Sequence, residues 1–305
     1  MEVYTLQNME YISLQSCKNR DLMDRLFLYV STVFFLSYFL GIYTSIQLAD
    51  QIHAGNLEPA FENPGDINNI WYIFTLILVG TGILFVIIKL YKKLLKVLEG
   101  IVIFFTTQLV LAAFLINVPE IVAYFISISF ALALALKQVL KPTILSQNIS
   151  VVFITAGAAS VLGVSLTPGI CFLIMFLLSC YDFIAVFLTK HMIYLAKEII
   201  DKPYSLVAAF PAENIKTQGK NFKKIKQKAH IFHLGAGDIA IPLLFTCSLL
   251  AYEGIIASIF STFFTFVSLS LLFLFMRKRV GIALPALPVV CAGASLGYLV
   301  FSLIF

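Results

Sequence analysis

Long apolar runs separated by short polar connections dominate the chain from Leu26 onward. Each run holds roughly 16–23 residues, and about 20 apolar residues in a helix cross the roughly 30 Å hydrocarbon core of a bilayer. The pattern therefore predicts nine membrane-spanning helices, at about Leu26–Leu48, Ile70–Leu90, Gly100–Ile116, Ile121–Leu136, Ile149–Leu166, Gly169–Leu188, Ile231–Tyr252, Gly254–Met276 and Leu284–Phe305.

Hydropathy alone leaves an interpretation with eight crossings open, because only Asn117–Glu120 separates the short third and fourth runs. The basic residues favour nine crossings. With nine spans, all 21 Lys and Arg fall in alternate connections, as expected when basic residues mark the cytoplasmic side of a membrane. One missed crossing would place every later loop on the wrong side. We therefore expect nine crossings, a cytoplasmic N-terminus and a C-terminus outside.

The composition agrees with a membrane protein. Of the 305 residues, 60 % are hydrophobic and 12 % are charged, whereas soluble domains average about 45–50 % and 25 %. A soluble fold of this size would leave much of that apolar excess facing water. The expected fold class is an all-α polytopic membrane protein with one membrane domain over residues 1–305. Helices 1–6 lie in 26–188, a basic cytoplasmic loop in 189–230, and helices 7–9 in 231–305.

Charge and cysteine content give little support to other classes. The net charge of +5 reflects loops on one side of a membrane, so we expect no nucleic-acid partner. The basic loop is typical of a solvated segment or of one that lies on anionic headgroups. The five cysteines show neither a Cys-x-x-Cys pair nor metal-ligand spacing. We therefore expect no metal site.

Two carboxylates, Asp182 and Asp238, fall inside predicted spans, whereas the other fourteen of the 16 Asp and Glu do not. A carboxylate at membrane depth is costly and usually functional. Both would reach a similar depth on consecutive antiparallel helices, nearer the cytoplasmic side. A single protonated aspartate that hydrogen-bonds between helices is the structural alternative, but a pair makes it weaker. The two residues therefore suggest acid–base chemistry or proton transfer.

Glycine and proline mark two further segments. Gly235 and Gly237 closely precede Asp238, and in a helix they allow close backbone approach or local unwinding. A small-residue packing interface explains them equally well. Pro285 and Pro288 favour an extended start of the ninth span, which would line a cavity at membrane depth. An ordinary helix N-terminus with proline in its first turn is the alternative.

Together these segments resemble a known family. Tyr181-Asp182, Gly235-Ala236-Gly237-Asp238 and Pro285-Ala286-Leu287 resemble the three motifs of presenilins and signal peptide peptidases, which are intramembrane aspartyl proteases. The chain looks like a prokaryotic, archaeal member of that family. The resemblance is clearest from Ile149 to the C-terminus, and the first four spans match only in number and hydropathy. Ala236 departs from the larger residue often found there, which bears on substrate preference.

The resemblance implies a presenilin-like fold and an endopeptidase that hydrolyses peptide bonds within transmembrane segments. It implies no cofactor, and a single-span membrane protein or a signal peptide as substrate. It also implies a multi-pass protein of the cell membrane. Whether the chain forms a homo-oligomer is left open. The implied roles are catalysis by Asp182 and Asp238, motif support by Tyr181, Gly235 and Gly237, and substrate binding by Pro285, Ala286 and Leu287. Tyr181 is equally consistent with helix packing.

Three other functions share some of these features. A proton-coupled transporter would use the two aspartates as a relay, although the chain shows no repeated half. A prepilin-type aspartic peptidase shares the Gly-x-Gly-Asp pattern but lacks the Pro-Ala-Leu segment. A catalytically silent module that binds membrane proteins would not require both acids. Incubation with a single-span substrate separates these functions by the presence of intramembrane fragments, and transport without cleavage would favour the transporter.

Overall fold

A computed structural model describes residues 20–61, 63–90, 92–187, 207–211, 231–278 and 286–305. Within these ranges the chain forms nine helices, one for each predicted span. They are α2 (Arg20–His53), α3 (Asn68–Leu90), α4 (Lys92–Phe114), α5 (Glu120–Leu140), α6 (Ile144–Val164), α7 (Pro168–Phe187), α10 (Ala236–Glu253), α11 (Ile255–Lys278) and α12 (Ala286–Ile304).

The described structure is all-helical, as predicted, apart from two short strands. Strands β1 (Val207–Pro211) and β2 (Ile231–Gly235) pair antiparallel, with Val207 opposite Gly235. The predicted basic loop therefore contains a strand, and the predicted seventh span begins as a strand, with its helix starting only at Ala236. Residues 231–235, which are apolar except for His233, continue directly into the helix. Such a short run does not distinguish a strand from a buried helical turn.

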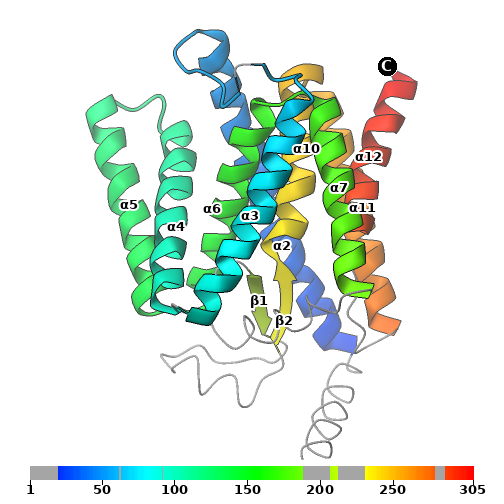
Figure 1. Cartoon of the computed structure of the whole chain (residues 1–305), viewed down its shortest axis with the longest axis horizontal. Coiled ribbons are helices and arrows are strands. Elements are labelled where there is room, and N and C mark those ends of the chain that lie inside the picture. The colour runs from blue at the N-terminus through cyan, green and yellow to red at the C-terminus, as the bar shows by residue number, and fades with distance from the viewer. Residues whose placement is uncertain (1–19, 62, 91, 188–206, 212–230, 279–285) are drawn as a thin grey trace, which may run out of the picture.

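The helices run roughly along one direction, with α2, α6 and α10 near the middle of the bundle. The α4–α5 hairpin lies at one side, and α11 and α12 lie at the other (Figure 1). The two strands lie at one end of the bundle, which we call the sheet end. Because α7 runs toward this end and α10 and α12 start from it, their sheet-end turns can supply one site.

Glycines allow the central helices to approach closely. A Cβ atom on Gly163 of α6 would lie 2.6 Å from both Cys247 Cβ and the Leu244 carbonyl oxygen of α10. On α12, a Cβ on Gly297 would lie 2.6 Å from the Phe260 carbonyl oxygen of α11, and one on Gly293 would collide with Ser268. Small residues at such positions are typical of helix packing in membranes.

Buried hydroxyl groups join the same helices. The hydroxyl groups of Thr155 in α6 and Ser37 in α2 lie at a hydrogen-bonding distance of 3.1 Å. Thr246 of α10 and Ser261 of α11 share a hydrogen bond at 3.0 Å. Hydrogen bonds of this kind between membrane helices typically contribute about 0.6–2 kcal/mol each. They add to the contacts that hold α10 against its neighbours.

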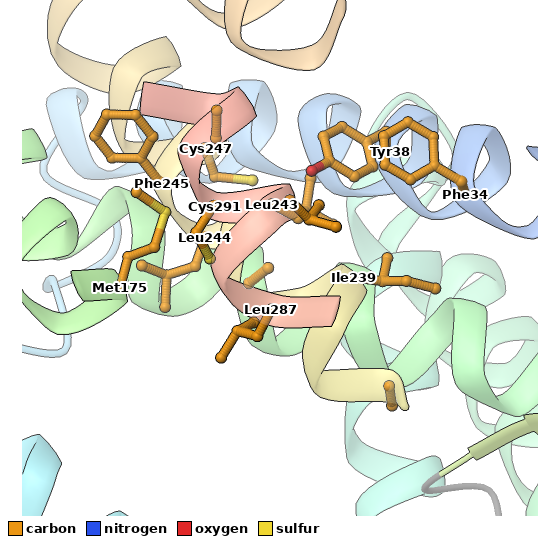
Figure 2. Packing of buried hydrophobic residues seen from close by; sticks show 14 of the residues in the cluster. Phe34, Tyr38, Met175, Ile239, Leu243, Leu244, Phe245, Cys247, Leu287 and Cys291 are labelled. Atoms are coloured by element: carbon orange, nitrogen blue, oxygen red, sulfur yellow. The ribbon is translucent and has the colours of Figure 1, made fainter. Parts of the chain in front are cut away.

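The main apolar core lies around α10. Its members come from α2, α3, α6, α7, β2, α10, α11 and α12, whereas a smaller cluster around Ile103 joins α4 and α5. Figure 2 shows Leu243 and Cys247 of α10 among side chains from α2, α7 and α12. The stacked rings of Phe34 and Tyr38 lie 4.1 Å apart, centre to centre. The sheet-end residues of α10 are thus attached to the best-packed part of the molecule.

The helices agree with the predicted membrane architecture. Among the described residues, seven helices are long and apolar enough to cross a bilayer. The other two, α3 and α7, contribute the shorter apolar stretches Asn68–Gly80 and Pro168–Ile184. The nine predicted spans are thus confirmed as nine helices within the described ranges. The sidedness of the two termini stays a prediction.

Candidate active site

The two aspartates come from α7 and α10 at the sheet end. Asp182 lies five residues before the end of α7, and Asp238 is the third residue of α10. Because α7 runs toward the sheet end and α10 starts from it (Figure 1), both aspartates lie in the part of their helix that is nearest this end. The two carboxyl groups are close enough for their charges to interact. The structure therefore brings together the pair that the sequence singled out.

Asp238 is positioned by the start of its helix, which corrects its predicted place in a helix interior. Gly235 is the N-cap residue of α10, with an extended backbone at φ −63° and ψ 136°. The backbone of Gly235 lies within hydrogen-bonding reach of the Asp238 carboxylate. A side chain at the third helical position commonly bonds the N-cap N–H in this way. The contact fixes the carboxylate relative to the end of β2.

The two glycines of the motif have different surroundings. A Cβ on Gly235 would lie 3.2 Å from Asp238 Oδ2, which is tighter than ordinary contact. A Cβ on Gly237 would meet only Ile241 Cδ1, at 4.0 Å, and Gly237 is exposed. Gly235 thus gives the carboxylate room, whereas Gly237 leaves open space beside it. Neither glycine weakens a helix interior, because the helix begins at Ala236.

The proline segment reaches the site through α12. Pro285 lies outside the described residues, and Ala286 begins the helix. Leu287 is buried, with 5 % of its surface exposed, and its backbone lies within hydrogen-bonding reach of the Asp182 carboxylate. Ala286, Leu287 and Pro288 form a helix start, so the extended geometry predicted for this segment does not reach them. The first turn of α12 therefore contacts Asp182 through its backbone.

Tyr181 lies at the edge of the site. Its side chain is 44 % exposed, whereas Asp182 and Asp238 are both partly buried. Adjacent residues in a helix point about 100° apart, so Tyr181 and Asp182 face different directions. Among the residues that the structure describes, no group of three or more His, Cys, Asp or Glu side chains could hold a metal ion.

Two residues at the site were missed by the sequence analysis. Cys291, on the next turn of α12 after Leu287, is 4 % exposed and lies within electrostatic range of both aspartates. Ser179, one turn before Asp182 on α7, lies beside the Cys291 thiol. Both residue types are ordinary in apolar helices, so only the helical spacing of three or four residues from the motifs could have indicated them.

Comparison with solved structures supports the fold. One structure, described as that of a presenilin family intramembrane aspartate protease in a C222 space group, superimposes with a TM-score of 0.66 at 22 % identity. The alignment covers 92 % of this chain and 99 % of that one. A second structure with the same description, in a P2 space group, gives a TM-score of 0.64 at 24 % identity. It covers 90 % of this chain and 97 % of the other.

The amino-acid sequence gives the family directly. Comparison with curated proteins gives no match. The family model described as signal-peptide peptidase, presenilin aspartyl protease matches residues 30–305, which includes every helix that contributes to the site. With nine helices in the described ranges, a presenilin-like fold and this match, the chain is a multi-pass membrane protein that belongs to the signal-peptide peptidase and presenilin aspartyl protease family.

Proposed function

We propose that the protein is an intramembrane aspartyl endopeptidase in which Asp182 and Asp238 together activate water. The observation that carries the proposal is the meeting of these two carboxyl groups, from α7 and α10, at the sheet end of an otherwise apolar bundle. Two acids whose charges interact favour a state in which one is ionised and the other protonated, because a second negative charge nearby is costly. That state contains a base and an acid side by side.

The reaction needs both forms. The ionised carboxylate takes a proton from water as the water oxygen attacks the scissile carbonyl carbon, and the protonated partner donates to the carbonyl oxygen. Collapse of the tetrahedral intermediate breaks the C–N bond, and a proton passes to the leaving amine. The pair titrates as one unit, so neither aspartate is assigned as the base. Activity should follow a bell-shaped pH curve with two apparent constants of the pair.

The surroundings of the pair support binding of an extended substrate. Strand β2 ends at Gly235, three residues before Asp238, and each strand of the two-stranded sheet has one edge that no other described strand covers. An extended peptide can add to such an edge through backbone hydrogen bonds. The open space beside Gly237 leaves room for its backbone near the carboxylate. We propose Pro285, Ala286 and Leu287 as further substrate contacts.

The proposed substrate is the transmembrane segment of a single-span membrane protein or a signal peptide, cleaved in the cell membrane. We propose a cytoplasmic N-terminus, an outside C-terminus and therefore a cytoplasmic sheet end, from the distribution of Lys and Arg. Reporter fusions after Leu48, Ile116 and Phe305 should read as outside, and fusions after Leu90, Leu136 and Met276 as inside. A cytoplasmic reporter at Phe305 would contradict this orientation.

The test uses purified protein in detergent or proteoliposomes with a single-span substrate, and mass spectrometry locates the cleaved bond. Asp182→Asn and Asp238→Asn should each reduce cleavage at least about 10³-fold, because an amide supplies neither base nor acid. Asp50→Asn, the same change at an exposed residue outside the site, is the matched control and should cleave normally. Substantial cleavage by either site variant, or proton-coupled transport without cleavage, would contradict the proposal.

A further inference from the structure

The Ser179 hydroxyl lies near the aspartate pair without a strong hydrogen-bond partner. Its Oγ atom is buried and bonds no oxygen or nitrogen atom, and its polar neighbour is the Cys291 thiol, which is only a weak donor and acceptor. Some buried hydroxyls of this protein bond a carbonyl oxygen one turn earlier, as Thr246 does to Pro242 at 3.0 Å. Others share the condition of Ser179, but none of these lies within one turn of Asp182 or Asp238: they are Ser31, Tyr38, Thr44, Ser45, Thr107 and Ser150. A buried polar group without a partner costs about 1–3 kcal/mol. A buried hydroxyl beside the aspartates with only a thiol as its polar neighbour therefore calls for an explanation.

The place of Ser179 relative to the aspartates supplies one. Ser179 precedes Asp182 by three residues on α7, and residues three apart lie on the same helical face. Helical side chains lean toward the N-terminus of their helix, so the Asp182 carboxyl group leans toward Ser179. Among the described residues, Ser179 is the only serine or threonine within one turn of either aspartate.

A contact with Cys291 places Ser179 on the side of the aspartate pair that faces α12. The Cys291 thiol lies beside the Ser179 hydroxyl, and it interacts electrostatically with both Asp182 and Asp238. Among the described residues, the ionisable groups around this contact are thus Cys291 from α12, Asp182 on the same helix as Ser179, and Asp238 from α10. The other neighbouring helix, α3, carries Tyr72 and Lys89 near its two ends and no ionisable residue in between.

We propose that Ser179 is a positioning residue whose hydroxyl donates a hydrogen bond to Asp182 when the pair carries its single negative charge. A hydroxyl can donate or accept a hydrogen bond. Ser179 can therefore donate to the Asp182 carboxylate when it is ionised and accept from it when it is protonated. The bond would orient the Asp182 carboxylate without contact between Ser179 and the substrate. This inference rests on the proposed function, because it assigns Ser179 a part in the same water activation.

The expected signature is a shifted pH curve. Removal of a donor makes the ionised form of the pair less favourable, so the base is lost at higher pH. For Ser179→Ala, the acid limb of the cleavage curve should move to higher pH by about half to one unit. The maximal rate should also fall several-fold, while KM stays near the wild-type value. A residue that only packs between helices would not move the acid limb.

Three comparisons make the test specific. Ser179→Thr keeps the hydroxyl and should restore the wild-type curve, and Ser179→Cys, a weaker donor, should shift it in the same direction by less. Ser160→Ala is the matched control, because it removes a buried helical hydroxyl that is bonded to Gly157 at 3.0 Å. It should leave the pH curve unchanged. Melting in detergent checks that each variant is folded, and Ser179→Cys carries the test if Ser179→Ala is unstable.

The outcomes separate this inference from the proposed function. Superimposable acid limbs for wild type, Ser179→Ala and Ser179→Cys would overturn the role of Ser179, while loss of cleavage in the two Asn variants would still support the aspartate pair. Equal shifts in Ser179→Ala and Ser179→Thr would also overturn it, because volume and not the hydroxyl would then be responsible. A wild-type protein that cleaves at no pH would overturn both.

Discussion

The two helices that supply the aspartates are packed very differently. In α10, every residue from Pro242 to Leu249 is buried, so its central turns are enclosed on all sides. In α7, a buried stripe that includes Ile170 and Ile174 lies beside a face whose large apolar residues are about half exposed, such as Phe176 at 56 %. That face is suited to lipid. Asp238 is therefore held by the core and by β2, whereas the position of Asp182 depends on a helix with one face free.

This difference indicates that the distance between the two aspartate carboxyl groups is set mainly by the position of α7 and by its contact with α12. The close packing of α10 against α6 and α2 leaves Asp238 little freedom, because interiors of proteins are packed as densely as crystals. The inner face of α7 is the surface on which Ser179 lies, beside Cys291 of α12. Variants in the buried turns of α10 should therefore change mainly the stability of the protein. Variants close to the two aspartates should change mainly the geometry of the site.

The largest expected effect comes from a matched pair of phenylalanines. Phe245 of α10 is 1 % exposed, and its replacement by Ala should lower the free energy of unfolding by about 3–5 kcal/mol. Phe176→Ala on α7 should cost less than about 1 kcal/mol, because detergent or lipid already covers the exposed ring. Denaturation of both variants in the same detergent measures the difference. Equal losses would contradict the contrast between the two helices.

A smaller effect is expected from a matched pair of glycines. Gly163→Ala would place a Cβ 2.6 Å from atoms of α10, and it should cost about 1–3 kcal/mol through displacement of that helix. Gly169→Ala, at the start of α7, meets no atom within 4 Å and should change the stability by less than about 1 kcal/mol. Melting temperatures in one detergent compare them. A tolerant Gly163→Ala variant would show that α6 and α10 are free to separate.

The smallest effect concerns the two glycines beside Asp238. Gly235→Ala should lower the cleavage rate by roughly tenfold, because a Cβ 3.2 Å from Oδ2 displaces the carboxylate by a few tenths of an ångström. The φ of −63° at Gly235 is accessible to alanine, so crowding is the only cost. Gly237→Ala should lower the rate less, since its Cβ enters open space. The ratio of the two rates on one substrate is the measurement, and a larger loss for Gly237→Ala would point to substrate contact at that position.

The sequence predicted the helices of the described ranges well, because hydropathy is a local property of the chain. The sidedness that the basic residues indicate stays a prediction. The sequence analysis missed strand β2, since residues 231–235 are apolar except for His233 and run directly into α10, while the partner strand begins more than twenty residues earlier. For the same reason it placed Asp238 inside a helix and not in a first turn. Boundaries of this kind depend on pairing that a hydropathy pattern does not contain.

The candidate site was only partly predictable. The aspartates were conspicuous because charge is rare in apolar spans, and the resemblance named their motifs. Ser179 and Cys291 were not conspicuous, because small polar residues are common in membrane helices and their contact crosses from α7 to α12. The contrast between Gly235 and Gly237 also depends on where the Asp238 side chain lies. Such contacts arise from tertiary packing and need a structure.

The direct junction of β2 and α10 has a mechanical consequence. Gly235 ends the strand and caps the helix, so no linker separates the sheet from the helix that carries Asp238. A tilt or slide of β2 must therefore be transmitted to the Asp238 carboxylate, with no intervening residues to absorb it. A peptide that pairs with the edge of the sheet would therefore change the orientation of the Asp238 carboxylate directly. Binding of the peptide and alignment of this carboxylate would then occur together.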